Sequence, residues 1–188
     1  MLRTTDISEV IRRLKDSETG VIPTDTVYGL VASAHNEAAV AKIYELKARQ
    51  NEPGTIIAAS ADQIANLGVD RRFLDKVKQY WPGAISVIVP YAGHLDYLHL
   101  GKESLAVRIP DNDFLLRLLE LTGPLVTSSA NLTGEPIANT AGEAYQYFGD
   151  KADFYVDGGD LSGAKPSTII RISDEGLEIL RRGAVEIK

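Results

Sequence analysis

Three hydroxyl-bearing side chains stand close together in the segment TDTVYGL (24–30), directly after an apolar stretch. In an extended backbone alternate residues point to the same side, so Thr24, Thr26 and Tyr28 would share one face. Such a row of hydroxyls could form one wall of a polar ligand pocket. The same residue types are also good formers of a strand with one solvated face, and both interpretations stand at this point.

Two cations, Lys47 and Arg49, end a predicted helix and precede the turn sequence QNEPG (50–54). An ammonium and a guanidinium group could hold a polyphosphate through charge-assisted hydrogen bonds. Cations at the last turn of a helix are also favoured by the helix dipole, with no ligand involved.

A third cation, Arg108, lies in the alternating segment SLAVRIP (104–110). Ser104 and Ala106 share its face, so the guanidinium group has small neighbours and room to bind a carboxylate through two parallel hydrogen bonds. The alternative is an arginine on an edge strand that reaches into water.

Short polar side chains end the apolar run PLVTSSAN (124–131). Ligand sites in α/β proteins favour the carboxyl ends of strands, so Thr127, Ser129 and Asn131 could bind phosphate oxygens or a metal-bound water. Serine and asparagine also simply begin turns. Ser167, which opens a predicted strand, and Arg181, which ends another, carry weaker signals of the same kind.

The composition excludes several other chemistries. The chain has no cysteine, which rules out disulfides, thiolate metal sites and a cysteine nucleophile, and its three histidines are too scattered for a convincing metal triad. A net charge of −6 and a pI of about 5.1 argue against a protein that mainly grips nucleic acid over a broad basic face. The segment GGDLSGAKPS (158–167) has the wrong spacing for a phosphate-binding loop.

Hydrophobic periodicity predicts short strands that alternate with helices. Helices are predicted over 7–18, 37–48, 62–67, 71–80, 113–122 and 141–148, the first two capped by Asp6 and Asn36. Strands are predicted over 55–60, 84–92, 104–110, 124–131, 153–157, 167–172 and 177–181. This interleaving indicates the α/β or mixed α+β class, in a single domain over 1–188. No apolar run approaches the roughly 20 residues of a membrane span, and no secretory signal begins the chain, so we expect a cytoplasmic protein without membrane contact.

Eight segments, in one order along nearly the whole chain, resemble the threonylcarbamoyl-AMP synthase family in its single-domain, YrdC-like (TsaC-like) form. They are PTDTVYGL (23–30), LKAR (46–49), WPG (81–83), SLAVRIP (104–110), TSSANLTGEP (127–136), DGG (157–159), STII (167–170) and LRRG (180–183). The resemblance implies a twisted mixed β-sheet with flanking helices around a concave cleft. It also implies a nucleotidyltransferase reaction: L-threonine, bicarbonate (or CO₂) and ATP give threonylcarbamoyl-AMP and pyrophosphate, the first step of N6-threonylcarbamoyladenosine formation in tRNA.

The resemblance assigns roles to particular residues. The residues expected to hold the triphosphate and the reaction centre are Lys47, Arg49, Ser129 and Asn131, with Ser104 and Arg181 on the nucleotide side. Those expected to bind threonine are Arg108 at its carboxylate and Thr26, Thr127 and Ser167 around it, supported by Thr24 and Tyr28. Mg²⁺ is expected to accompany ATP, although no carboxylate identifies itself as a ligand. A downstream tRNA threonylcarbamoyl-transferase complex is the implied partner, with weak or indirect tRNA binding.

The chain departs from the family pattern after the Lys-x-Arg segment, at position 50. The family usually has a proline there and then a Pro-Leu-x-x-His-like run, whereas this chain has QNEPGTIIA (50–58). The contacts of that loop with a nucleotide are therefore open. Two alternatives remain at the level of sequence: an RNA-binding protein that uses the same cleft, and a catalytically silent homologue that binds the nucleotide without turnover.

Overall fold

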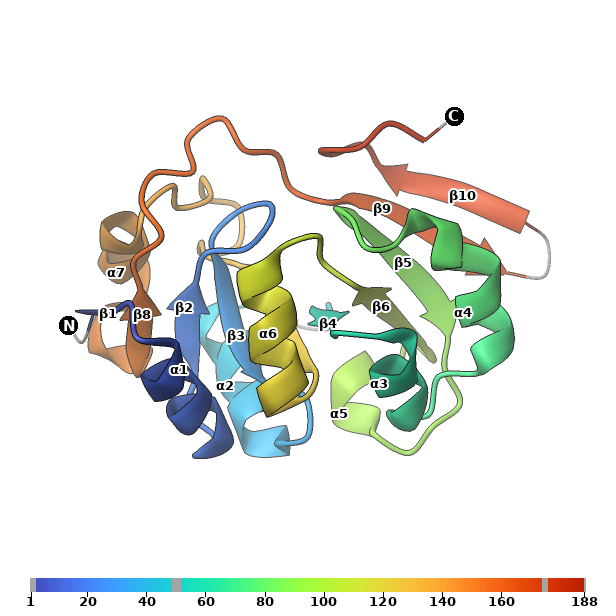
Figure 1. Cartoon of the computed structure of the whole chain (residues 1–188), viewed down its shortest axis with the longest axis horizontal. Helices are drawn as coiled ribbons and strands as arrows, with labels where there is room; N and C mark the ends of the chain where they lie inside the picture. The colour runs from blue at the N-terminus through green and yellow to red at the C-terminus, as the bar shows by residue number, and fades with distance from the viewer. Residues whose placement is uncertain (1–2, 49–51, 174–175, 188) are drawn as a thin grey trace.

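The computed structural model describes residues 3–48, 52–173 and 176–187, which form one mixed β-sheet flanked by helices (Figure 1). Within this part of the chain the strand order is β1-β8-β2-β3-β7-β4-β6-β5-β9-β10. The strands are β1 (Arg3–Thr4), β2 (Gly20–Ile22), β3 (Gly29–Ser33), β4 (Thr55–Ile57), β5 (Ile85–Pro90), β6 (Ser104–Arg108), β7 (Leu125–Ser129), β8 (Phe154–Val156), β9 (Thr168–Ser173) and β10 (Gly176–Arg181). Parallel pairs such as β4–β6 and β5–β9 alternate with antiparallel pairs such as β3–β7 and β5–β6, so the mixed sheet expected from the sequence is confirmed.

Two hydrophobic cores lie against the sheet. The α-helices are α1 (Ile7–Lys15), α2 (Glu37–Leu46), α3 (Ala61–Asn66), α4 (Arg71–Val77), α5 (Asp96–His99), α6 (Asp113–Thr122) and α7 (Ala141–Phe148). Helices α1 and α6 lie side by side and form the smaller core, while the other helices contribute to the larger one (Figure 1). Side chains alternate between the faces of a strand, so Leu125 of β7 enters the smaller core and Val126 the larger. The smaller core covers only part of the sheet face against which it packs.

The helices begin where the sequence places their caps. The Asp6 carboxylate accepts a hydrogen bond from the Ser8 N–H, and the Asn36 side chain accepts one from the Ala39 N–H. Each cap satisfies a backbone donor that the first helical turn leaves without a partner, which explains why α1 and α2 start there.

The extended conformation expected for residues 24–28 is wrong. These residues form the loop between β2 and β3, which pair as an antiparallel hairpin. The Thr24 hydroxyl donates to the Val27 carbonyl (2.6 Å) and accepts from the N–H groups of Thr26 (3.1 Å) and Val27 (3.2 Å). This local bonding curls the backbone and replaces a strand ladder, so the hydroxyl of Tyr28 does not join those of the two threonines.

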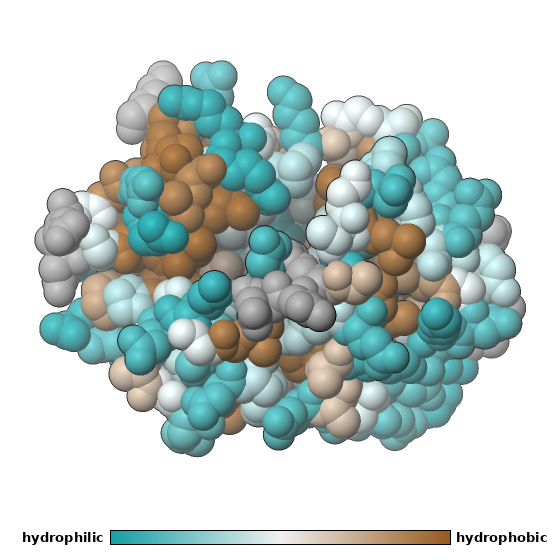
Figure 2. Space-filling view, turned by 180° about the vertical axis from the view of Figure 1, so that it is seen from behind, coloured by the Kyte–Doolittle hydropathy of each residue, from teal (hydrophilic) through white to brown (hydrophobic). Residues whose placement is uncertain are grey.

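The far edge of the sheet carries exposed apolar side chains. Leu177 and Leu180 on β10 and Val185 just after it are exposed, and hydrophobic surface gathers over the C-terminal strands in Figure 2. Within the described residues, every helix is too short or too polar to cross a bilayer.

Candidate active site

A cavity of about 500 Å³ opens on the sheet face beside the smaller core, and its described lining comes from strands and loops alone. The register of the sheet builds its floor: Thr127 of β7 pairs with Thr55 of β4, which pairs with Ala106 of β6, and that residue pairs with Ile88 of β5. The small or hydroxyl-bearing side chains of Thr127, Thr55 and Ala106 leave most of the floor open, and Ile88 closes its far end. The volume lies in the range of small-molecule sites, which is about 300–1,000 Å³.

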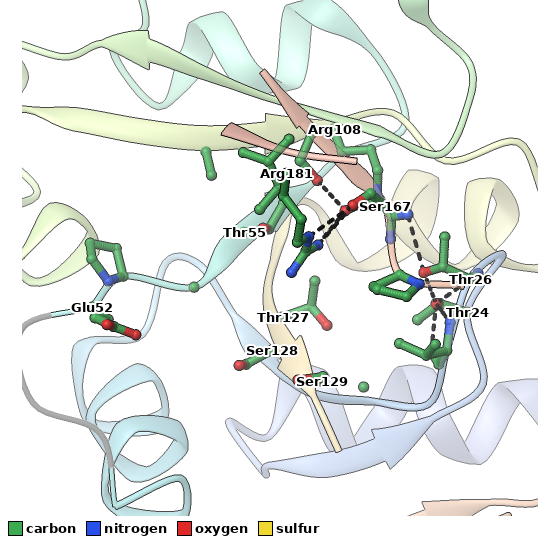
Figure 3. A pocket seen from close by; sticks show the side chains of 18 of the residues that line it. Thr24, Thr26, Glu52, Thr55, Arg108, Thr127, Ser128, Ser129, Ser167 and Arg181 are labelled. Atoms are coloured by element: carbon green, nitrogen blue, oxygen red, sulfur yellow. Dashed lines mark hydrogen bonds between the residues drawn. The ribbon is translucent and has the colours of Figure 1, made fainter. Parts of the chain in front are cut away.

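One wall of the cavity carries a buried guanidinium group (Figure 3). Arg108 ends β6, which is an interior strand between β4 and β5, and its side chain is only 4% exposed. Its Nη1 donates to the Thr26 Oγ1 (3.3 Å), and that oxygen lies 2.9 Å from the Thr24 Oγ1. Burial lowers the pKa of Arg108, and the nearby Asp25 carboxylate opposes that change. An interior position excludes the edge-strand alternative and leaves a fixed cation on the wall.

A chain of polar contacts continues from this wall across β5 and β9. The Ser86 Oγ lies 2.9 Å from the Ser167 Oγ, and both side chains line the cavity. Arg181 donates to the Ser167 carbonyl through Nε (3.2 Å) and Nη2 (2.8 Å). Arg181, expected on the nucleotide side, therefore contacts Ser167, expected on the amino-acid side.

A close backbone approach shapes the β7 side of the cavity. Thr127, Ser128 and Ser129 line it together with Gly29 of the neighbouring strand β3. A Cβ added at Gly29 would lie 2.6 Å from the Thr127 Oγ1, so a glycine is needed at this position to leave room for that hydroxyl.

Behind this side lies a cluster centred on Lys47, which directly follows α2 and is 3% exposed. Its Nζ donates to the Ser129 carbonyl (2.8 Å), the Asn131 carbonyl (2.7 Å) and the Asn131 Oδ1 (2.7 Å). The Ser129 Oγ also donates to the Asn131 Oδ1 (2.7 Å), and Asn131 Nδ2 donates to the Glu135 carbonyl (2.6 Å). The lysine therefore organises the turn that follows β7 and reaches the cavity through Ser129.

The structure brings most of the expected site residues together. Those that line the cavity are Thr24, Thr26, Tyr28, Arg108, Thr127, Ser129, Ser167 and Arg181. Lys47 and Asn131 lie directly behind its wall, whereas Ser104 lies on β6 outside the described lining. Arg49 lies outside the described residues.

Tyr28 is a special case among these residues. It is fully buried, and its hydroxyl donates to the Gly159 carbonyl (2.8 Å) and accepts from the Gly158 N–H (2.9 Å). Burial raises the pKa of this hydroxyl. Its described hydrogen bonds thus hold the loop after β8.

Sequence reasoning missed several polar residues of the site, and three of them contact or neighbour the expected residues; Glu52, Lys102, Ser128 and Arg171 also line the cavity. Ser86 and Thr55 line the cavity, and Asp25 pairs with Arg108 behind it. A serine inside the otherwise apolar run AISVIVPYA (84–92) was a usable signal for Ser86. Asp25 carried no such signal, because an acidic residue beside threonines is ordinary in a turn.

The polar lining of the cavity consists of hydroxyls and cations, with Glu52 at a separate edge (Figure 3). Among the described residues, no group of three or more histidines, aspartates or glutamates could hold a metal ion. The magnesium ion expected from the sequence would therefore have to take ligands from the phosphate oxygens of ATP, and this stays a prediction.

The comparison with known proteins agrees with this arrangement. The family model Sua5/YciO/YrdC, described as "Telomere recombination", matches residues 12–183. The chain belongs to this family. Within the family, the threonylcarbamoyl-AMP synthase of Pseudomonas aeruginosa (strain UCBPP-PA14) is 39% identical over 82% of this chain and 86% of its own length. The synthase of Bacillus subtilis (strain 168) is 32% identical over 95% of this chain, which spans 54% of the length of that relative.

A solved structure of the family has the same fold. Sua5 from P. abyssi, crystallised in complex with L-threonine, superimposes with a TM-score of 0.84 at 29% identity. The match covers 97% of this chain and 56% of that protein. The YrdC-like fold expected from the resemblance is confirmed.

Proposed function

We propose that this protein is a threonylcarbamoyl-AMP synthase, which converts L-threonine, bicarbonate (or CO₂) and ATP to threonylcarbamoyl-AMP and pyrophosphate. The observation that carries the proposal is the meeting, at one cavity, of a buried guanidinium group at Arg108 with the turn held by Lys47 at Ser129 and Asn131. Family membership and the names of the relatives support the same assignment.

On the amino-acid side, Arg108 binds the carboxylate of threonine, for which the planar guanidinium group supplies two parallel donors. Thr26 holds that group in place, and Thr24 holds Thr26. Thr127 and Ser167 shape the space around the substrate side chain. Tyr28 acts indirectly, because its hydroxyl holds the loop that borders the cavity.

The proposed reaction depends on the positions of the two substrates and needs no nucleophile from the protein. The amine of threonine attacks CO₂ and loses one proton to solvent, which gives a carbamate. A carbamate oxygen then attacks the α-phosphorus of ATP, the bond from that phosphorus to the bridging oxygen breaks, and pyrophosphate leaves with the electron pair. Holding both reactants in one water-poor cavity and neutralising the phosphate charge supply the rate enhancement.

On the nucleotide side, Ser129 presents its hydroxyl to the phosphates, while Asn131 acts from behind the wall, where it and Lys47 hold Ser129 in place. Arg49 and Ser104 are further proposed nucleotide contacts, and Arg181 lies where the two substrates meet. Magnesium enters as part of MgATP and neutralises phosphate charge. The protein would act in the cytoplasm and pass its product to a tRNA threonylcarbamoyl-transferase complex.

Pyrophosphate release from the pure protein tests this proposal. The release should need ATP, threonine and bicarbonate together. Pyrophosphate release without threonine, or no release under varied magnesium and pH, would contradict it and favour a silent homologue. RNA binding that weakens steeply with salt, without turnover, would favour the RNA-binding alternative.

A further inference from the structure

A buried carboxylate stands directly behind the guanidinium group of the cavity wall. The Asp25 Oδ1 lies 3.2 Å from the Arg108 Nη1, and the two side chains are 5% and 4% exposed. Thr26, the next residue along the loop, accepts a hydrogen bond from the same nitrogen. Two consecutive residues of one loop therefore determine where this end of the guanidinium group points.

The two members of the ion pair face different spaces. Arg108 lines the main cavity, whereas Asp25 lines a second hollow with Tyr80, Gly83 and Asp111 and is not among the residues that line the first. A substrate in the main cavity would meet the guanidinium group and not the carboxylate. Any influence of Asp25 on that substrate passes through Arg108.

The pair is a costly arrangement for stability alone. Both groups lose most of their hydration, and burial raises the pKa of Asp25 while it lowers that of Arg108. By strict hydrogen-bond geometry, neither carboxylate oxygen of Asp25 nor the Nε of Arg108 has a partner within the described residues. The backbone N–H groups of Asp111 and Asp25 lie near the carboxylate and only oppose the rise in its pKa. Buried ion pairs with incomplete hydrogen bonding are poor stabilisers compared with apolar side chains of similar volume. The pair therefore contributes little to stability. It is better explained by a need to keep Arg108 charged and in one orientation.

We propose that Asp25 is a positioning residue for recognition of the amino-acid carboxylate: it fixes the Arg108 guanidinium group so that its free donors face the cavity. This inference rests on the function proposed above. Without the carboxylate, the Thr26 hydroxyl is the one described hydrogen-bond acceptor left to Arg108. The unpaired, buried cation would then rotate toward the water of the cavity and lose its preset geometry.

The test is the steady-state kinetics of pyrophosphate release by Asp25→Asn, which removes the charge at nearly constant shape. We expect the KM for threonine to rise by about tenfold, which corresponds to about 1.4 kcal/mol, while the KM for ATP stays within about twofold. Glu186→Gln is the matched control, because it removes an acidic charge from an exposed residue of the same second hollow. It should leave both KM values unchanged.

Two further measurements separate positioning from a structural role. L-Threoninol lacks the carboxylate, so the preference of the protein for threonine over threoninol, measured by competitive binding, should shrink in Asp25→Asn. When Arg108 is already alanine, Asp25→Asn should change threonine affinity no further, because the two residues act as a unit. If Asp25→Asn does not fold at the assay temperature, Asp25→Glu, which keeps the charge but displaces it, should show the same selective rise in the KM for threonine.

An unchanged or lower KM for threonine, or an equal rise in both KM values, would overturn the inference. The proposed function fails separately, when the wild-type protein releases no threonine-dependent pyrophosphate.

Discussion

Replacement of Lys47 by methionine should damage both the fold and the activity, because one buried ammonium group holds the turn that borders the cavity. Methionine keeps most of the length of the side chain and removes its charge and donors. Three oxygens of Ser129 and Asn131 lie within 2.8 Å of the Lys47 Nζ and would lose this donor. The Ser129 carbonyl keeps the Asn131 N–H and the Asn131 Oδ1 keeps the Ser129 hydroxyl, so the Asn131 carbonyl is the most affected.

The magnitude follows from these contacts. A hydrogen bond to a charged group contributes about 1.5–3 kcal/mol, and an unsatisfied buried acceptor costs about 1–3 kcal/mol. The buried ammonium group no longer has to be desolvated, and water can enter at the cavity; both recover part of the sum, so we expect a net loss of about 3 kcal/mol. In a chain of this size, 1 kcal/mol corresponds to about 2–4 °C in Tm, so the Tm should fall by about 6–12 °C.

Thermal unfolding followed by circular dichroism measures this loss, and pyrophosphate release measures the accompanying loss of turnover, which we expect to exceed about 100-fold. Lys42→Met is the matched control on the same helix. Its Nζ pairs with Asp153, but the two side chains are 36% and 31% exposed, so the loss should stay below about 1 kcal/mol. A Lys47→Met protein that melts within about 2 °C of wild type would refute the role of the lysine as organiser of the turn.

Four further changes have definite expected outcomes. Arg108→Lys should raise the KM for threonine by about tenfold or more and leave the KM for ATP nearly unchanged, because one ammonium cannot replace two parallel donors; an equal effect on both would contradict this. Tyr28→Phe removes two hydrogen bonds to the loop at 158–159 and should lower the free energy of unfolding in urea by about 1–3 kcal/mol. Gly29→Ala should displace the Thr127 hydroxyl and weaken threonine binding, measured by calorimetry, with Tm nearly unchanged. Burial raises the pKa of Asp25, so its contribution to stability is full below the usual aspartate range and is lost as the pH rises through the raised value; Asp25→Asn should flatten that part of the pH–stability curve.

The elements governed by local interactions could be predicted from the sequence. The caps at Asp6 and Asn36 satisfy donors only two or three residues away, so residue type and spacing suffice to place the starts of α1 and α2. The loop at 24–28 shows the limit of this reasoning. Its residue types suit a strand, and only the three hydrogen bonds of the Thr24 hydroxyl reveal that the backbone curls.

The parts of the site that depend on strand order could not be predicted. The interior position of Arg108 follows from the pairing of β6 with both β4 and β5, which no local pattern encodes. The burial of Lys47 behind Ser129 likewise depends on how α2 packs against the end of β7. The resemblance to a known family assigned both residues to one site, and the structure places Arg108 in the cavity lining and Lys47 behind it. The contacts of Lys47 and the partner of Arg108 required the structure.

The carbon of bicarbonate gives the sharpest test of the proposed synthase activity, because it should end in the adenylate product. The pure protein is incubated with ATP, threonine, magnesium and ¹³C-labelled bicarbonate, and the adenylate product is weighed by mass spectrometry. We expect threonylcarbamoyl-AMP that is one mass unit heavier than the product made with unlabelled bicarbonate. This product should form only when threonine is present. Turnover of ATP that leaves no labelled carbon on an adenylate, or that proceeds equally well without threonine, would contradict this expectation.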